Sequence, residues 1–464
     1  MSNSAEAARG KSSAIPDGLE PPRMYWATAV LLLTITVSVL DSSMANVALP
    51  AIARDLDINP GDVVLVAIAY NLTVVSSILP LSAVAERMGF RRMLGLGVAL
   101  FIVMSVAAAL SGTFWQITLA RIGQGFGSSM IMCLFGGLVR NIYPNRKLGL
   151  GLSLNAATVG LMAVLGPTLG AFILEVGSWQ WIFLITIPVG MLIFFGLRFL
   201  PDVPRNSGRF DWMACALSAP FFGLSILGLD ALVKNPALAA LCFVLAGLAG
   251  WALVRRSRDQ AAPLVPIDLL RIKPLAFAVA ASGFSFAAQM SAFVALPFYF
   301  RHVLDYSYAD VGLLLGAWSI GGAAMAPLAG YLSGRYPVAV LCGIGALSMA
   351  LGMLSLIVLP MGPDFLWLVL GMLVAGVGFG FFQTPNNRAL LAGAPRRRSG
   401  AAGGLQATTR VFGQSFGTAL VAVSFNLSHQ HGPVLAIAAG SLCALIALGI
   451  NIARYFSPIP DLEL

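Results

Sequence analysis

Residues 25–49 read YWATAVLLLTITVSVLDSSMANVAL, an apolar segment in which Asp41 is the only charged residue. A helix of about 20 apolar residues crosses the roughly 30 Å hydrocarbon core of a bilayer, so this segment is long enough to span a membrane. It is too long for the apolar region of a signal peptide, and no small-residue cleavage site follows it. The segment therefore predicts a retained transmembrane helix that carries a carboxyl group.

The rest of the chain has the same character. Of its 464 residues, 58% are hydrophobic and 10% are charged, whereas about a quarter are charged in an ordinary soluble domain. Too few polar residues are present to cover soluble domains, which excludes a water-soluble enzyme and a nucleic-acid binder. All five cysteines lie in apolar segments, so neither a disulfide framework nor a cysteine zinc site is indicated. We expect an all-α polytopic membrane protein that uses no cofactor and no metal.

Fourteen apolar segments are long enough to span the bilayer. They are residues 25–49, 62–84, 92–111, 114–138, 147–174, 179–200, 211–232, 237–254, 274–300, 308–333, 337–358, 364–385, 399–425 and 433–453. With both termini on one side, 23 of the 28 Lys and Arg residues lie on that side and three lie on the other, namely Arg54, Lys234 and Arg301. Because cytoplasmic loops carry the excess of Lys and Arg, both termini are expected in the cytoplasm.

The sequence repeats itself. PLSAVAERMG at residues 80–89 resembles PLAGYLSGRY at residues 327–336, an offset of 247 residues. Eight spans fit into this offset, whereas two six-helix halves joined directly would repeat after six. The offset therefore predicts two six-helix halves separated by an inserted pair of helices. The expected units are a disordered tail (1–23), an N-terminal half (24–200), the inserted pair with its linkers (201–258), a C-terminal half (259–455) and a second tail (456–464). Parallel halves of this kind place a substrate cavity between them near the bilayer midplane.

Asp41 is the acidic residue that lies deepest in a predicted span. An ionisable group in hydrocarbon costs several kcal/mol and marks a functional site by default. One face of this span is polar at positions i, i+4, i+7 and i+8, which are Thr34, Ser38, Asp41 and Ser42, so this face is expected to line a cavity. Arg121 lies at a depth from which its side chain reaches Asp41. An arginine favours the charged carboxylate and burial favours the neutral acid, so the pair can take up and release a proton. The alternatives are a carboxylate that caps a neighbouring helix and an arginine with a structural role.

Two further features suggest moving parts. The turn after the second span carries an acid followed by bases, Glu86, Arg87, Gly89, Arg91 and Arg92. These can form ion pairs that close an inner gate, with Gly89 giving the turn its backbone freedom; ordinary positive-inside anchors are the alternative. The fifth span has small residues at helical spacing, which let another helix approach closely; they are Ser153, Ala156, Gly160, Ala163, Gly166 and Gly170. Pro167 in the same stretch is expected to bend that helix.

A substrate pocket is predicted from polar and aromatic residues in both halves. The candidates are Ser38, Asn46, Tyr70, Asn71, Gln124, Gln289, Phe293, Tyr299, Trp318, Phe381 and Gln383. Such a lining suits apolar substrates with few fixed polar contacts, although packing and lipid-facing roles stay open for each residue. His429 and His431 make an incomplete metal site, and the acidic residues that follow the first span have no second cluster to complete one.

Four motifs resemble those of one known family. They are LDSSMANVALP at 40–50, LARIGQG at 119–125, GPTLGA at 166–171 and SWQWIFLITIPVG at 178–190. In this order they are similar to motifs of the first, fourth, fifth and sixth helices of the fourteen-helix drug:proton antiporters of the major facilitator superfamily, and the resemblance covers residues 24–455. It implies that Asp41 is the proton-coupling acid and Arg121 its relay partner. It also implies a hinge at Gly166, Pro167 and Gly170.

The resemblance implies proton-coupled export of small lipophilic compounds across the cytoplasmic (inner) membrane, by a monomer whose partners are the substrate, protons and membrane lipids. Relatives in that family that export divalent cations tend to use additional membrane carboxylates, and the last six spans have none. Neutral or singly charged compounds are therefore expected. Export of a specific metabolite, such as a sugar, an amino-acid derivative or a siderophore, is the alternative. A sensor or assembly partner that transports nothing is a third hypothesis.

Overall fold

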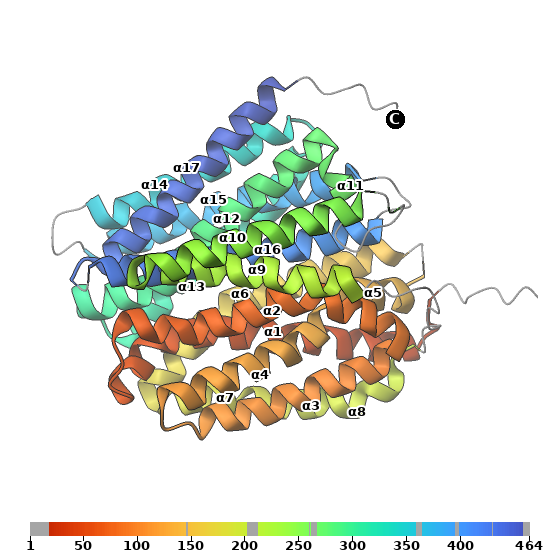
Figure 1. Cartoon of the computed structure of the whole chain (residues 1–464), viewed down its shortest axis with the longest axis horizontal. Coiled ribbons are helices and arrows are strands. Elements are labelled where there is room, and N and C mark those ends of the chain that lie inside the picture. The colour runs from red at the N-terminus through yellow and green to blue at the C-terminus, as the bar shows by residue number, and fades with distance from the viewer. Residues whose placement is uncertain are drawn as a thin grey trace, which may run out of the picture.

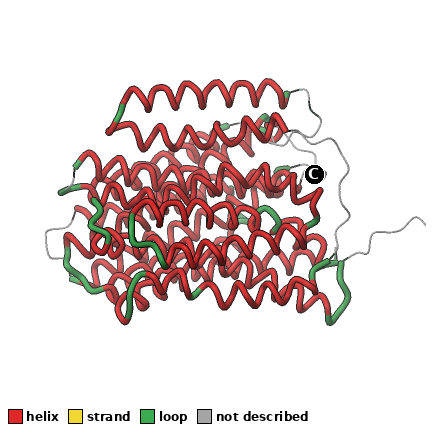
Figure 2. Tube along the Cα trace, turned by 60° about the horizontal axis from the view of Figure 1, so that its bottom comes forward, coloured by secondary structure: helices red, strands yellow, loops and turns green. Residues whose placement is uncertain are grey.

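The structure is a computed structural model that describes residues 18–144, 147–201, 212–258, 260, 267–358, 364–394, 399–428 and 430–457. Within these ranges the regular structure is helical and contains no strand. The helices run roughly along one common direction and are joined by short loops (Figure 2). Most of both predicted tails, residues 1–17 and 458–464, and most of the linker before the inserted pair lie outside the described residues.

The first eight helices build the N-terminal half. They are α1 (Arg23–Asp55), α2 (Pro60–Met88), α3 (Phe90–Ala109), α4 (Phe114–Met132), α5 (Phe135–Ile142), α6 (Leu148–Val176), α7 (Gln180–Leu184) and α8 (Thr186–Gly196), followed by a 3-10 turn, Leu197–Phe199. The inserted pair is α9 (Trp212–Lys234) and α10 (Pro236–Ser257).

The C-terminal half begins with a short helix, α11 (Ile267–Leu270). It continues with α12 (Lys273–Phe298), a π-helical turn (Tyr299–Val303), α13 (Tyr308–Leu332), α14 (Val338–Val358), α15 (Phe365–Ala392), α16 (Ser399–Leu427) and α17 (Gly432–Phe456). The chain begins α1 and ends α17 at the same end of the bundle (Figure 1). We call this the terminal end and the opposite one the far end.

Twelve of the described helical segments are long and apolar enough to cross a bilayer, which makes this a multi-pass membrane protein. Two further helices, α6 and α16, correspond to the predicted spans 147–174 and 399–425. Each has 29 residues, or about 43 Å at 1.5 Å per residue. The sequence of α16 is less apolar because it contains hydroxyl side chains, and several of these are buried among other helices, such as Thr408 and Ser415. The count of fourteen spans stays a prediction.

Local sequence explains where the helices start and stop. Gly89 separates α2 from α3 with a φ of 97°, a conformation that glycine adopts without steric cost. Ser307 and Asp310 form a capping box at the start of α13, which satisfies backbone N–H groups that no intrahelical carbonyl reaches. Such caps matter in a membrane because an unpaired backbone group in hydrocarbon costs several kcal/mol.

The internal repeat is visible in the packing. Gly97 of α3 lies against the backbone carbonyl of Gly127 in α4, and Gly345 of α14 lies in the same way against Gly378 in α15. Small residues at such crossings let two backbones approach closely. The glycines on α3 and α14 are 248 residues apart, within one residue of the 247-residue offset of the sequence repeat. The two pairs of helices are thus structural counterparts.

The two halves meet along two equivalent seams. α2 packs against α16, and α6 packs against α13. The inserted pair covers the first seam, because α9 packs on both α2 and α16 while α10 packs on α9 (Figure 1). At the far end of this insert, Lys234 of α9 forms an exposed ion pair of 2.7 Å with Asp62 of α2. The residue boundaries of the predicted units stay a prediction.

Candidate functional site

Asp41 and Arg121 meet in the interior of the N-terminal half. Arg121 Nη1 lies 2.7 Å from Asp41 Oδ2, and the two residues are 1% and 0% exposed. The pair joins the middle of α1 to α4. Removing one partner of a buried pair leaves an uncompensated charge and costs about 3–5 kcal/mol. The contact therefore holds the two helices in one arrangement as long as both groups are charged.

Gln124 and Ser105 extend this pair into a network. Gln124 lies one turn after Arg121 on α4, and its Oε1 accepts a hydrogen bond of 3.0 Å from Arg121 Nη1. Its Nε2 donates to Asp41 Oδ1 at 3.3 Å and to Ser105 Oγ of α3 at 2.8 Å. Both carboxylate oxygens of Asp41 thus accept a donor from α4. Buried polar groups are costly unless they are paired, so this network fixes the rotation of three helices about their axes.

An aromatic side chain covers the arginine. Arg121 Cζ lies 4.1 Å from the ring centroid of Tyr70 in α2 and 5.7 Å from that of Phe183 in α7. A cation above a ring face is stabilised by the ring quadrupole, most strongly where water is excluded. The Tyr70 hydroxyl donates to Ser128 Oγ at 2.8 Å. Arg121 Nε is buried without a hydrogen bond within the described residues, so the rings and the Nη1 contacts hold the guanidinium.

The sequence predicts four of these residues, and the structure brings them together: Asp41, Arg121, Gln124 and Tyr70. The sequence analysis does not identify Ser105 as a member of this network. A serine in the otherwise apolar third span is a signal that could have found it, because Ser105 is completely buried and its own hydroxyl donates to the Phe101 carbonyl.

Other pocket candidates lie elsewhere in the bundle. Asn46 donates to Met290 Sδ at 3.3 Å, and Asn71 donates to Thr418 Oγ1 at 3.4 Å, so both connect the two halves. Ser38 donates to a backbone carbonyl one turn earlier in α1. The remaining candidates lie in the C-terminal half, where Phe293 and Trp318 form an edge-to-face pair with centroids 5.4 Å apart, and Tyr299 donates to a carbonyl of α14. Gln289, Phe381 and Gln383 are partly buried on α12 and α15.

The predicted hinge lies beside Asp41. A Cβ placed on Gly166 of α6 would meet the Ser43 side chain, and one on Gly170 would lie 3.1 Å from Met44 Cα. Both neighbours belong to α1 and follow Asp41 within three residues. Pro167 is an interior residue of α6. Gly160 is also part of α6, but its surroundings and the side chains of Ser153, Ala156 and Ala163 are not described.

The predicted gate turn lies at the terminal end, between α2 and α3. Arg87, Arg91 and Arg92 are exposed there, and the Glu86 side chain lies outside the described residues. Gly89 provides the turn through its positive φ. The gating role of these residues stays a prediction.

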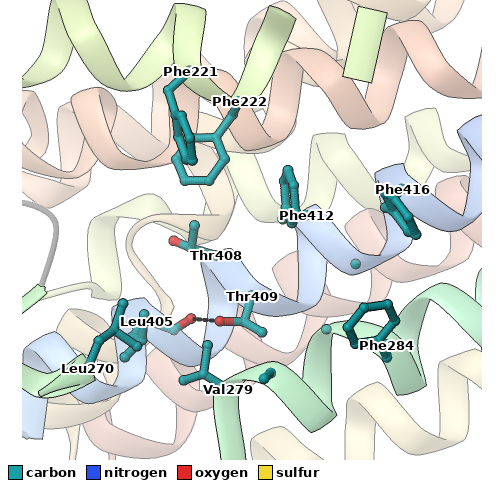
Figure 3. Close-up of a pocket in the computed structure, with 13 residues that line it drawn as sticks. Phe221, Phe222, Leu270, Val279, Phe284, Leu405, Thr408, Thr409, Phe412 and Phe416 are labelled. Carbon is teal, nitrogen blue, oxygen red and sulfur yellow. Dashed lines mark hydrogen bonds between the residues drawn. The ribbon is translucent and has the colours of Figure 1, made fainter. Parts of the chain in front are cut away.

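A cavity of about 350 Å³ lies between α9, α12 and α16 (Figure 3). Five phenylalanines dominate its lining, Phe221, Phe222, Phe284, Phe412 and Phe416. The hydroxyls of its lining belong to Thr408 and Thr409; Thr409 donates to the Leu405 carbonyl at 2.7 Å, while Thr408 Oγ1 is buried without a partner in the part of the chain that the structure describes. None of the pocket candidates from the sequence lines this cavity, because its walls come from α9, residues 279–284 of α12 and residues 405–416 of α16.

Comparison with known proteins gives a consistent picture. The sequence profile described as Major Facilitator Superfamily matches residues 31–418. The chain is 38% identical over 447 residues to the uncharacterized transporter YebQ of Escherichia coli, covering 95% of this chain and 98% of that protein. It is 26% identical to the riboflavin transporter RibZ of Clostridioides difficile, covering 87% and 89% of the two chains. It is 27% identical to the multidrug efflux pump LfrA of Mycolicibacterium smegmatis, covering 88% and 82%.

Solved structures share the fold at low sequence identity. A crystal structure of the peptide transporter POT superposes with a TM-score of 0.70 at 16% identity and covers 92% of this chain and 94% of that one. A D-xylose–proton symporter superposes with a TM-score of 0.66 at 17% identity, covering 91% and 97%. The likeness extends along the whole bundle.

Proposed function

The chain belongs to the Major Facilitator Superfamily and is a membrane transporter rather than an enzyme, and from this premise we propose that it exports small lipophilic compounds in exchange for protons. The observation that carries the proposal is the sealed network of Asp41, Arg121 and Gln124. An ionisable group in a membrane span marks an ion or substrate pathway by default.

A proton on Asp41 changes the forces between α1 and α4. The charged carboxylate accepts donors on both oxygens from Arg121 and Gln124. Protonation removes the charge that holds these donors, and the arginine is then left buried without an anion. The protonated and charged forms thus favour different packings of the two helices. The close contacts of Gly166 and Gly170 with residues 43 and 44 transmit such a change to α6, which contacts α13 of the other half.

Water access decides when the proton moves. Both charged side chains are fully buried in this structure, so exchange with water requires that the halves open on one side. Alternating access couples this opening to transport. With both termini in the cytoplasm, a proton that enters moves down the membrane potential. One charge across 100 mV is worth about 2.3 kcal/mol and one pH unit adds about 1.4 kcal/mol, enough for a gradient of about a hundredfold or more in a neutral compound.

The lipophilic character of the substrate is supported by the phenylalanine cavity. Its walls combine five aromatic rings with one hydroxyl that has no hydrogen-bond partner among the described residues. Apolar pockets with a few polar groups suit such ligands. Relatives of this chain include proteins named as multidrug efflux pumps. A specific metabolite is the second candidate, and it is favoured by the relative named as a riboflavin transporter.

Proton release from purified protein tests the coupling. Wild-type protein in weakly buffered detergent solution should release protons when a transported compound is added, and D41N should release none. D57N is the matched control, because Asp57 is exposed and its positive φ of 52° is one that asparagine tolerates. Proton-coupled export by a folded D41N variant at the wild-type rate would refute the proposal.

A growth-inhibition panel separates the two substrate classes. The gene is expressed in a strain that lacks its own efflux pumps, and the panel contains structurally diverse lipophilic toxicants. Protection against several unrelated compounds supports drug export. Protection against none, together with secretion of one metabolite into the medium, supports the second candidate.

A further inference from the structure

Arg410 is a membrane arginine to which the proton network gives no role. It lies eleven residues after Ser399, the first residue of α16, which places it about 16 Å along the helix at 1.5 Å per residue. This is close to the middle of the bundle and too deep for the snorkelling that brings arginines at helix ends to water. Arginines at such depth are rare and face cavities or partners.

The surroundings of Arg410 differ from those of Arg121. Within the described residues its guanidinium forms no ion pair and no hydrogen bond, and its side chain is partly exposed rather than sealed. Val411, the next residue along α16, is buried in one cluster with Tyr70 of α2, whose ring also covers Arg121. Arg410 therefore lies on the side of α16 that approaches the N-terminal half.

The faces of α16 agree with this position. Gln406, Arg410 and Gln414 recur every four residues and are all partly exposed, so they form a polar face, which we call the Arg410 face. Further along the helix, Thr418 accepts the hydrogen bond from Asn71 of α2. The phenylalanine cavity lies on another face of α16, which Phe412 and Phe416 share (Figure 3). The Arg410 face thus borders the seam between the halves, where parallel halves place a substrate cavity.

The charges near the middle of the bundle do not balance. In the described helices, charged residues other than Asp41, Arg121 and Arg410 lie within the first or last five residues of their helix. Asp41 and Arg121 neutralise each other, which leaves the positive charge of Arg410 in excess. A cation that enters the seam is repelled by this charge, whereas an anion supplies the missing partner.

We propose that Arg410 binds an anionic group of the transported compound, so that this transporter selects amphipathic organic anions over cations. The inference rests on the proposed transport function and names its substrate class. A guanidinium pairs with a carboxylate or sulfonate through two parallel hydrogen bonds. Gln406 and Gln414, one turn to either side, provide amide groups for the remaining acceptor positions.

Three probes with one ring system test this selectivity. Naphthylacetate is an anion, naphthylacetamide is its neutral counterpart of nearly equal shape, and naphthylethylammonium is a cation. Their affinities for the purified full-length protein are measured by isothermal titration calorimetry without a proton gradient. Wild-type protein should bind the anion most tightly and the cation most weakly. In R410M the affinity for the anion should fall about tenfold or more, as expected for the loss of a charge-assisted hydrogen bond, and that for the amide should change less than threefold.

Two variants serve as controls. R410K keeps the charge and should keep the preference for the anion. R335M removes an exposed arginine at the terminal end and should leave all three affinities unchanged. The proposal is overturned if wild-type protein does not bind the anion more tightly than the cation, a test that does not depend on the folding of R410M. It is also overturned if R410M lowers the affinities for the anion and the amide equally. Proton release is measured on the same wild-type sample, so that a failure of proton coupling and a failure of anion selection are distinguishable.

Discussion

The buried pair between Asp41 and Arg121 should behave very differently from the exposed pair between Asp62 and Lys234, although both are 2.7 Å long. The side chains of the first pair are 0% and 2% exposed, and those of the second are 40% and 36% exposed. Coulomb attraction at equal distance grows as the local dielectric falls. Burial, and not length, therefore determines the strength of each pair.

A double-mutant cycle measures this difference. D41N and R121M each leave one polar partner buried without its counterpart, and each should lower the free energy of unfolding by about 3–5 kcal/mol. The double variant places two neutral groups side by side, so its loss should be smaller than the sum of the single losses by about 3 kcal/mol. The same cycle with D62N and K234M should give a coupling energy below about 1 kcal/mol, because solvent screens exposed pairs.

Reversible unfolding in mixed micelles of a mild detergent and sodium dodecyl sulfate, followed by tryptophan fluorescence, provides these free energies. Losses in D41N and R121M that add within about 0.5 kcal/mol, the range of independent sites, would contradict the buried network. Equal coupling energies for the two pairs would contradict the role given to burial.

Three further outcomes follow from the packing. G376A should abolish folding or lower the melting temperature strongly, because its Cβ would overlap the Trp318 carbonyl. The Cβ of G247A meets nothing within 4 Å, so this variant should gain up to about 1 kcal/mol in free energy of unfolding from helix propensity. Thermal melts of both variants check this. F412A removes a ring that lies 5.6 Å from Phe222 in the cavity and should weaken the binding of a lipophilic substrate about tenfold, as read by calorimetry; unchanged binding would exclude this cavity from the transport route. Y70L removes the ring above Arg121 and should reduce export more than Y70F, as measured in proteoliposomes.

Much of the architecture can be predicted from sequence because the bilayer imposes simple rules. A span must be apolar over about 20 residues, so segment lengths identify most helices. The high cost of burying a charge makes Asp41 and Arg121 conspicuous. The difference between their depths is short enough for an arginine side chain to cover, which is enough to pair them. These inferences need only the position of each residue along its helix.

The parts that sequence does not predict depend on rotation and neighbours. Ser105 contributes to the network only because α3 turns that residue toward Gln124, and an apolar span gives no periodicity that fixes its rotation. The phenylalanine cavity requires α9 to pack on α16. No rule of hydropathy states where an inserted pair attaches to the two halves. Packing between segments that are distant in sequence decides it, here of α9 on α2 and α16.

The two halves share their packing and differ in their chemistry. Gly125 of α4 lies against the Tyr70 carbonyl, and Gly376 of α15 lies against the Trp318 carbonyl in the same way. At the offset of 251 residues that relates these glycines, the counterpart of Arg121 is Met372. The two halves therefore share the close helix crossings, which a larger side chain would disturb. The charged pair is present in the N-terminal half alone. In the proposed mechanism the N-terminal half senses protons, while Arg410 gives the C-terminal half its own charge for the substrate. In the seam between α2 and α16, the Tyr70 ring covers Arg121 and packs in one cluster with Val411, the neighbour of Arg410. This seam is then the place where proton binding influences substrate binding.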